Sequence, residues 1–164
     1  MSADHDGARL SHAMAPTGRP GGGAPVYAVE IGFADVDFAR MPFFADYFSW
    51  VERALEAWLH ANGLYYRELV GARGVGLPIV EAHCRYTAPL GLEDVVEVQL
   101  VLSEVTRRGF RIGFDMARRV DGARVAHGHV LRRFIDLASK KPMEIDDDLL
   151  RIFRAMAHES REES

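Results

Sequence analysis

The longest hydrophobic pattern in the chain has helical spacing and falls within residues 43–62. Apolar side chains recur there every three or four positions and would form one broad stripe: Tyr47, Phe48, Val51, Ala54, Leu55, Trp58 and Leu59. Pro42 stands near the start, where a missing N–H is tolerated, and Asn62-Gly63 is a typical helix end. The pattern predicts one long helix with a face that must be buried.

Other stretches alternate between apolar and polar positions or are rich in β-branched and aromatic residues. They predict five strands: 26–33, 77–86, 94–106, 108–120 and 124–137. Each of the last three strands gathers residues on one face: Val96, Val98, Leu100 and Leu102; Phe110, Ile112, Phe114 and Met116; Val130, Arg132 and Phe134. Asp121-Gly122 is a strong hairpin signal, and consecutive strands joined by tight turns form an antiparallel sheet.

The helix of residues 43–62 is the one element large and apolar enough to cover a face of that sheet. We therefore expect an α+β fold, in which a five-stranded antiparallel sheet wraps around one long central helix. A short C-terminal helix is expected over 146–156, with acids at its start. The expected organisation is a flexible tail over 1–25, a domain over 26–158 and a C-terminal tail over 159–164.

Composition and charge restrict the class of protein. The formal net charge of −4 gives no general attraction to nucleic acid or to an anionic membrane surface. No apolar run is long enough to span a bilayer, and the phosphate-binding glycine motifs of the P-loop and Rossmann types are missing. Cys84 is the single cysteine, which agrees with a reducing compartment. We expect a cytoplasmic protein with no cofactor and no nucleic-acid or membrane partner.

Two acids, Asp35 and Asp37, lie on the segment that enters the long helix. A helix start offers unpaired N–H groups and a partial positive charge, so a carboxylate beside it suits carbonyl chemistry. The residues alone are equally compatible with Asp37 capping the helix or forming a local turn. Asp35 is expected to orient the loop.

The order of these segments, with these residues, resembles the hotdog fold and, more narrowly, the 4-hydroxybenzoyl-CoA thioesterase family. The run from Phe33 to Asp37 and the run from Tyr47 to Ala54 carry the likeness most clearly. Further matching segments are 76–80, 92–96 and 107–110. The resemblance covers roughly residues 26–137, and it is the ordered spacing of several weak motifs that makes it fairly specific.

The resemblance implies an acyl-CoA thioesterase. Asp37 would attack the thioester carbonyl or activate water, and the N–H of Phe44 would hold the oxyanion, a kind of contact that contributes about 3–4 kcal/mol. The implied partners are an acyl-CoA substrate and further copies of the chain, in a homodimer or homotetramer with sites at the subunit boundary. Expected substrate contacts are Phe38, Arg40, Phe43 and Tyr47, with Arg107 and Arg108 on the phosphates of CoA.

Arg40 departs from the family pattern, because relatives carry a glycine at that position. Its side chain either narrows the site or binds a substrate carboxylate or a CoA phosphate. The alternative function is a non-hydrolytic hotdog protein that binds thioesters of CoA or acyl carrier protein. A hotdog hydratase or dehydratase is disfavoured, because it needs an Asp–His pair and the first histidine after Asp37 is the distant His60.

Other polar residues have ordinary structural explanations. Glu52 invites comparison with a second hotdog thioesterase class, in which a helix carboxylate does the chemistry, but an ion pair with Arg53 or another neighbour is favoured. Three strand histidines suggest a metal site, yet their spacing fixes no complete ligand set, so we expect none: His83, His127 and His129. Cys84 is expected to be a small buried apolar residue.

Overall fold

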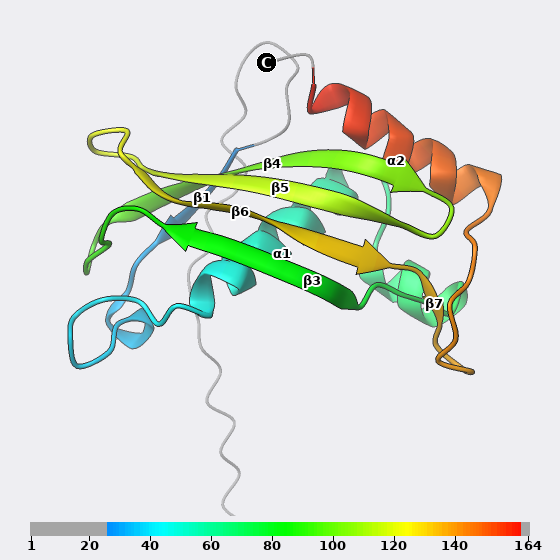
Figure 1. Ribbon diagram of the computed structural model, residues 1–164, viewed down its shortest axis with the longest axis horizontal. Helices are drawn as coiled ribbons and strands as arrows, with labels where there is room; N and C mark the ends of the chain where they lie inside the picture. The colour runs from blue at the N-terminus through cyan, green and yellow to red at the C-terminus, as the bar shows by residue number, and fades with distance from the viewer. Residues whose placement is uncertain (1–25, 162–164) are drawn as a thin grey trace, which may run out of the picture.

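A five-stranded antiparallel sheet carries the fold, with the strand order β1–β4–β5–β6–β3 (Figure 1). The strands are β1 (Val26–Glu30), β3 (Ile79–Tyr86), β4 (Val95–Thr106), β5 (Gly109–Arg118) and β6 (Arg124–Arg133). The computed structural model describes residues 26–161, so the tail expected over 1–25 lies outside the described residues. The predicted α+β class and the predicted five-stranded sheet are confirmed.

The long helix α1 (Asp46–Ala61) packs against β1 and β4 and fills the curve of the sheet (Figure 1). Its predicted apolar stripe is buried except for Phe48, which is only partly buried. The inner faces of β4, β5 and β6 are also buried, including the partly charged face that carries Arg132. The helix begins three residues later than the predicted start at residue 43. Phe43 to Ala45 instead form a turn, in which the Asp46 N–H donates to the Phe43 carbonyl at 2.9 Å.

Helix α2 (Asp147–Glu159) lies alongside the C-terminal part of β4 (Figure 1). Strand β1 pairs with β4 only as far as Gln99, so the edge of β4 beyond that residue needs another cover. There the Leu102 N–H donates to the Ser160 hydroxyl at 3.2 Å, and both residues are buried. Glu159 and Ser160, expected in a C-terminal tail, therefore belong to the end and cap of α2; the domain limits otherwise stay a prediction.

Other element boundaries also differ from the sequence prediction. β1 ends at Glu30, because Phe33 to Asp35 form the short helix η1. The last predicted strand is broken at Phe134, after which β7 (Ile135–Asp136) pairs with β2 (Val75–Gly76) in a second, two-stranded sheet. Between α1 and β2 the chain also forms the π-helix η2 (Arg67–Ala72).

Strand β3 stands at the open edge of the sheet, as Figure 1 shows. Within residues 26–161 no strand pairs with its outer side, and most of its side chains are exposed, including those of Ile79, Val80 and Tyr86. A long exposed edge of this kind is a template for pairing with another strand.

None of the helices in the described part of the chain combines the length and the hydropathy that crossing a membrane requires. The expected cytoplasmic location stays a prediction.

Candidate active site

Asp37 lies at the base of a tight loop that runs between β1 and α1. Val36 and Pro42 form an antiparallel bridge at the neck of this loop. The Asp37 N–H donates to the Met41 carbonyl at 3.0 Å, and the Asp37 carbonyl accepts from the Arg40 N–H at 2.9 Å. One carboxylate oxygen, Oδ1, accepts from the Ala39 N–H at 2.7 Å. The second oxygen, Oδ2, makes no hydrogen bond to a described residue, so it is available for chemistry.

Arg40 occupies the left-handed position of this loop, with φ of 60°. A type I turn followed by a left-handed residue is a common three-residue connection, and glycine is favoured at its last position. A left-handed conformation costs an L-residue about 1–2 kcal/mol, a strain that glycine avoids. The glycine that the resemblance implies at this position would avoid this strain, whereas Arg40 adopts the left-handed conformation at that cost.

A pocket of about 520 Å³ opens beside the Asp37 carboxylate. It is lined by Phe33, Val36, Asp37, Arg40, Gly91 and Leu92. Apart from one carboxylate and one guanidinium the lining is apolar, which suits a thioester whose carbonyl is polar and whose acyl part is not. Gly91 and Leu92 were not expected from the sequence, because no local pattern links them to a loop more than fifty positions earlier.

A second pocket, of about 410 Å³, lies at the start of α1. Its lining residues are Met41, Pro42, Phe44, Tyr47 and the run from Tyr86 to Leu90. The Tyr86 hydroxyl donates to the Phe44 carbonyl at 2.6 Å, and its ring meets the Tyr47 ring edge-on at 4.9 Å. Burial raises the pKa of Tyr86, so this hydroxyl remains a protonated donor at neutral pH. Tyr86 was missed in the sequence because it ends a distant strand.

The N-cap residue of α1 provides no side-chain cap for the helix start. Ala45 is the N-cap residue, so Asp37 does not cap the helix, and of the two local roles considered only the turn is observed. The Phe44 N–H makes no hydrogen bond to another described residue. An uncapped helix start has free donors and a partial positive charge, as oxyanion stabilisation requires.

The predicted substrate-contacting residues fall into separate groups. Asp37 and Arg40 share the first pocket, whereas Phe44 and Tyr47 share the second. Phe43 lies against Phe44, with ring centroids 4.4 Å apart, and is half exposed. Phe38 is fully exposed at the tip of the loop and lines neither pocket, because the turn after Asp37 points its side chain outward.

Arg107 and Arg108 lie in a third pocket, of about 680 Å³, together with Arg133 and Glu144. Arg107 pairs with Asp147 at the start of α2, and this contact raises the pKa of Arg107 and lowers that of Asp147. The Nε of Arg108 donates to Glu144 at 3.0 Å. Both arginines therefore already have acidic partners, although they are largely exposed and point into an open basic pocket.

Glu52 forms an ion pair, as expected from the sequence, and its partner in the structure is Arg132. Arg132 is almost fully buried and also donates to the Leu77 carbonyl at 2.5 Å. Burial lowers the pKa of Arg132 to about 10, so the guanidinium stays charged at neutral pH. Glu52 is thus committed to holding α1 against β6 rather than standing free as a second carboxylate.

The strand histidines make contacts of their own. His83 stacks on His129 with centroids 5.5 Å apart, and His129 hydrogen-bonds to Glu81 at 2.6 Å. Within residues 26–161, no three side chains of the metal-binding types gather closely enough to hold a metal ion. Cys84 was expected to be buried, but it is only partly so because it lies on the edge strand.

Comparisons with known proteins point to one family. The sequence model of the thioesterase-like superfamily matches residues 31–153. Over 88 residues the chain is 34% identical to a 1,4-dihydroxy-2-naphthoyl-CoA hydrolase from Synechococcus elongatus, covering 53% of this chain and 65% of the relative. Over 98 residues it is 29% identical to a 4-hydroxybenzoyl-CoA thioesterase from Pseudomonas, covering 58% and 70%. The matched stretch thus spans about two thirds of each curated relative.

A solved structure shows the same fold. Slr0204, a 1,4-dihydroxy-2-naphthoyl-CoA thioesterase from Synechocystis, superposes with a TM-score of 0.72 at 19% identity, covering 81% of this chain and 94% of that one. The predicted hotdog fold is confirmed by this likeness.

Proposed function

The chain belongs to the thioesterase-like superfamily, and we propose that it is an acyl-CoA thioester hydrolase with Asp37 as its catalytic carboxylate. The observation that supports this role best is the position of Asp37: it lines a largely apolar pocket, keeps one carboxylate oxygen without a hydrogen bond to a described residue, and lies on the loop that leads to the start of α1. The relatives named above are CoA hydrolases, which supports the same reaction class.

Two routes are open to the Asp37 carboxylate. It can attack the thioester carbonyl, which releases the CoA thiolate and leaves an acyl anhydride that water then hydrolyses. Alternatively, it takes a proton from a water molecule as that water attacks. In both routes the carbonyl oxygen gains negative charge, and the Phe44 N–H is the proposed donor to it. Single-turnover hydrolysis in oxygen-18 water distinguishes the two, because only direct attack first transfers an unlabelled aspartate oxygen to the product.

The second pocket is the proposed acyl site. Its aromatic residues are held by the Tyr86 hydrogen bond to the Phe44 carbonyl, which also fixes the turn before α1. Flat aromatic walls favour flat apolar groups, so an aromatic acyl group is the expected substrate. The two curated relatives named above act on aromatic acyl-CoA thioesters, which agrees with this choice.

We also place the active unit in a homodimer, or a tetramer built from dimers. The edge of β3 is open, and exposed aromatic side chains surround the candidate site: Phe33, Phe38, Phe43 and Phe44. Pairing of two β3 edges would cover part of this apolar surface and join two sheets into one. Light scattering of the purified protein tests this assembly, and a purely monomeric species would contradict it.

The reaction is tested by thiol release from a panel of aromatic and short aliphatic acyl-CoA thioesters. Asp37→Asn is expected to lower kcat by about 10²–10⁴-fold, because an amide is neither a base nor an effective nucleophile here. Asp35→Asn is the matched control, since Asp35 only accepts a structural bond from the Gly32 N–H at 2.8 Å. An Asp37→Asn protein as active as wild type would refute the proposed role.

The second candidate function is a non-hydrolytic binder of acyl thioesters. Arg40 favours it, because a long charged side chain stands in the pocket where the family carries a glycine. Calorimetric titration separates the two, since a binder retains the acyl-CoA intact and an enzyme releases free thiol.

A further inference from the structure

One irregular segment, residues 87–94, forms a wall of both pockets. Thr87 to Leu90 line the second pocket, at the start of α1, which we call the aromatic pocket. Gly91 and Leu92 line the pocket of Asp37. The segment joins β3 to β4 and contains no helix or strand, so its position depends on individual contacts. The shape of both pockets therefore depends on whatever fixes this segment.

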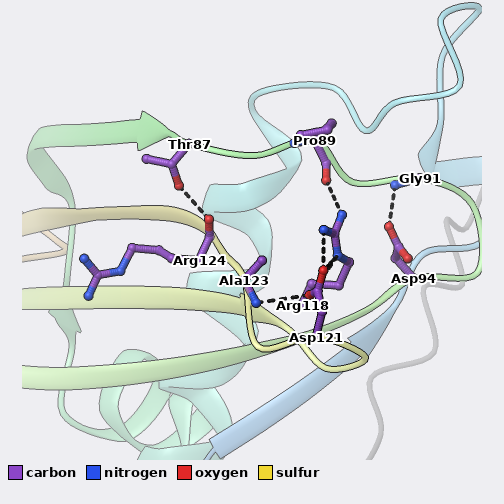
Figure 2. Close-up of polar contacts among 8 residues, drawn as sticks. All are labelled: Thr87, Pro89, Gly91, Asp94, Arg118, Asp121, Ala123 and Arg124. Carbon is purple, nitrogen blue, oxygen red and sulfur yellow. Dashed lines mark hydrogen bonds and ion pairs between the residues drawn. The ribbon is translucent and has the colours of Figure 1, made fainter.

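Arg118, the last residue of β5, forms a hydrogen bond to the middle of this segment (Figure 2). Its Nη1 donates to the Pro89 carbonyl at 2.9 Å. Pro89 has no N–H, so this carbonyl is the one backbone hydrogen-bonding group that the residue offers. The side chain of Arg118 is 22% exposed, which shields the contact from water better than at most surface arginines of the chain.

The guanidinium of Arg118 is itself held in place by Asp121 in the β5–β6 turn. Its Nε donates to Oδ1 at 3.1 Å and its Nη2 donates to Oδ2 at 2.7 Å, a two-pronged pair with fixed geometry. Asp121 Oδ1 also accepts from the Ala123 N–H at 3.1 Å, which ties the carboxylate to the turn (Figure 2). The turn, the carboxylate, the guanidinium and the Pro89 carbonyl thus form one continuous chain of bonds.

The ends of the segment are anchored separately. At one end the Thr87 hydroxyl donates to the Arg124 carbonyl at 2.8 Å (Figure 2). At the other end the Glu93 N–H donates to the Ile31 carbonyl at 2.8 Å, and the Gly91 N–H closes a turn onto Asp94 Oδ2 at 2.8 Å. Arg118 acts between these anchors, immediately before Leu90, whose side chain is buried in the core. Loss of Arg118 would therefore loosen the wall around Pro89, while its ends and the side chain of Leu90 stay attached.

We infer that Arg118, held by Asp121, is a positioning residue that sets the acyl-binding wall through the Pro89 carbonyl. This inference rests on the proposed function. The wall contacts the acyl part of the substrate and carries none of the groups proposed for the chemical step. Its displacement should weaken ground-state and transition-state binding alike, which raises KM and leaves kcat nearly unchanged.

The test compares Arg118→Gln with Arg124→Gln. Arg124 pairs with Asp115 on the same hairpin: its Nε donates to Oδ1 at 2.7 Å, and its Nη2 lies 2.7 Å from Oδ2 in an ion pair. Its side chain extends away from the 87–94 segment in Figure 2, so it is a matched control for loss of a surface pair. We expect Arg118→Gln to raise KM about tenfold and Arg124→Gln to leave KM unchanged. Arg118→Lys, which keeps one charged donor, should raise KM less than Arg118→Gln does.

Amide hydrogen exchange provides a second measurement, which does not depend on catalytic activity. In Arg118→Gln the amides of residues 88 and 90–92 should exchange about tenfold faster than in wild type and in Arg124→Gln. Equal KM values and equal exchange in the two variants would overturn the inference. A wild-type protein that hydrolyses no thioester would instead overturn the proposed function. In that case, faster exchange in Arg118→Gln but not in Arg124→Gln would still show that Arg118 positions the wall.

Discussion

Replacing Arg40 by glycine should stabilise the protein, although it removes a long side chain. Arg40 has φ of 60°, which costs an L-residue about 1–2 kcal/mol and costs glycine nothing. Glycine gives back about 0.5–1 kcal/mol through the greater freedom of the unfolded chain. The Arg40 side chain is exposed and makes no ion pair with a described residue, so little else is lost. The expected net gain is about 0.5–1 kcal/mol.

Thermal unfolding measures this gain. For a domain of this size, 1 kcal/mol corresponds to about 2–4 °C in Tm, so Arg40→Gly should melt about 1–4 °C higher than wild type. Arg40→Ala is the control, because it removes the same guanidinium and keeps the left-handed strain; its Tm should stay close to that of wild type. A lower Tm for Arg40→Gly would refute the reasoning about strain at this position.

The same two variants report on substrate binding. If the guanidinium holds an anionic group of the thioester, both variants raise KM by a similar factor, since both lack the charge. Comparison of CoA and dephospho-CoA thioesters then tells a CoA phosphate from a carboxylate on the acyl group. If Arg40 only narrows the pocket, both variants lower KM for bulky acyl groups instead.

Three further predictions concern stability, pH and the aromatic pocket. Glu52→Gln should lower the free energy of unfolding by about 2–4 kcal/mol in denaturant titration, because it leaves the buried Arg132 unpaired; a loss under 0.5 kcal/mol would contradict this. Folding lowers the pKa of Asp121 from 3.8 to about 2, because Arg118 donates hydrogen bonds to the ionised carboxylate. The contribution of this pair to the free energy of unfolding is therefore complete above about pH 4 and disappears as the pH falls towards 2. Asp121→Asn should flatten that part of the acid-unfolding curve. Tyr86→Phe should lower kcat/KM about tenfold with little change in Tm, and unchanged kinetics would refute a role for its hydroxyl.

Much of the fold followed from spacing along the chain. The stripe on α1 and the apolar faces of β4 and β5 were predicted correctly, because a residue's place on a helix or strand depends on its near neighbours alone. The turn at Asp121-Gly122 was predicted for the same reason, since its conformation is a local preference. The family, and with it the class of reaction, was also within reach of the sequence, because several short motifs occur in a fixed order.

The site needed the tertiary structure. The pairing of Glu52 with Arg132 joins residues 80 positions apart, and Gly91 and Leu92 reach the loop of Asp37 only through the path of β3 and β4. The roles of Asp37 in catalysis and of Phe44 as oxyanion donor stay predictions, as do the contacts of Arg107 and Arg108 with CoA.

Local patterns in the sequence were sufficient to predict which residues share a face and where the chain turns, and to nominate one acid as the candidate for the chemistry. The surroundings of that acid could be known only from the folded chain: Gly91 and Leu92 in the pocket beside it, the bond of Tyr86 to the Phe44 carbonyl, and the bond of Arg118 to the Pro89 carbonyl. The reason is physical. Secondary structure follows from the preferences of adjacent residues, whereas a pocket forms where strand register and helix packing bring distant segments together.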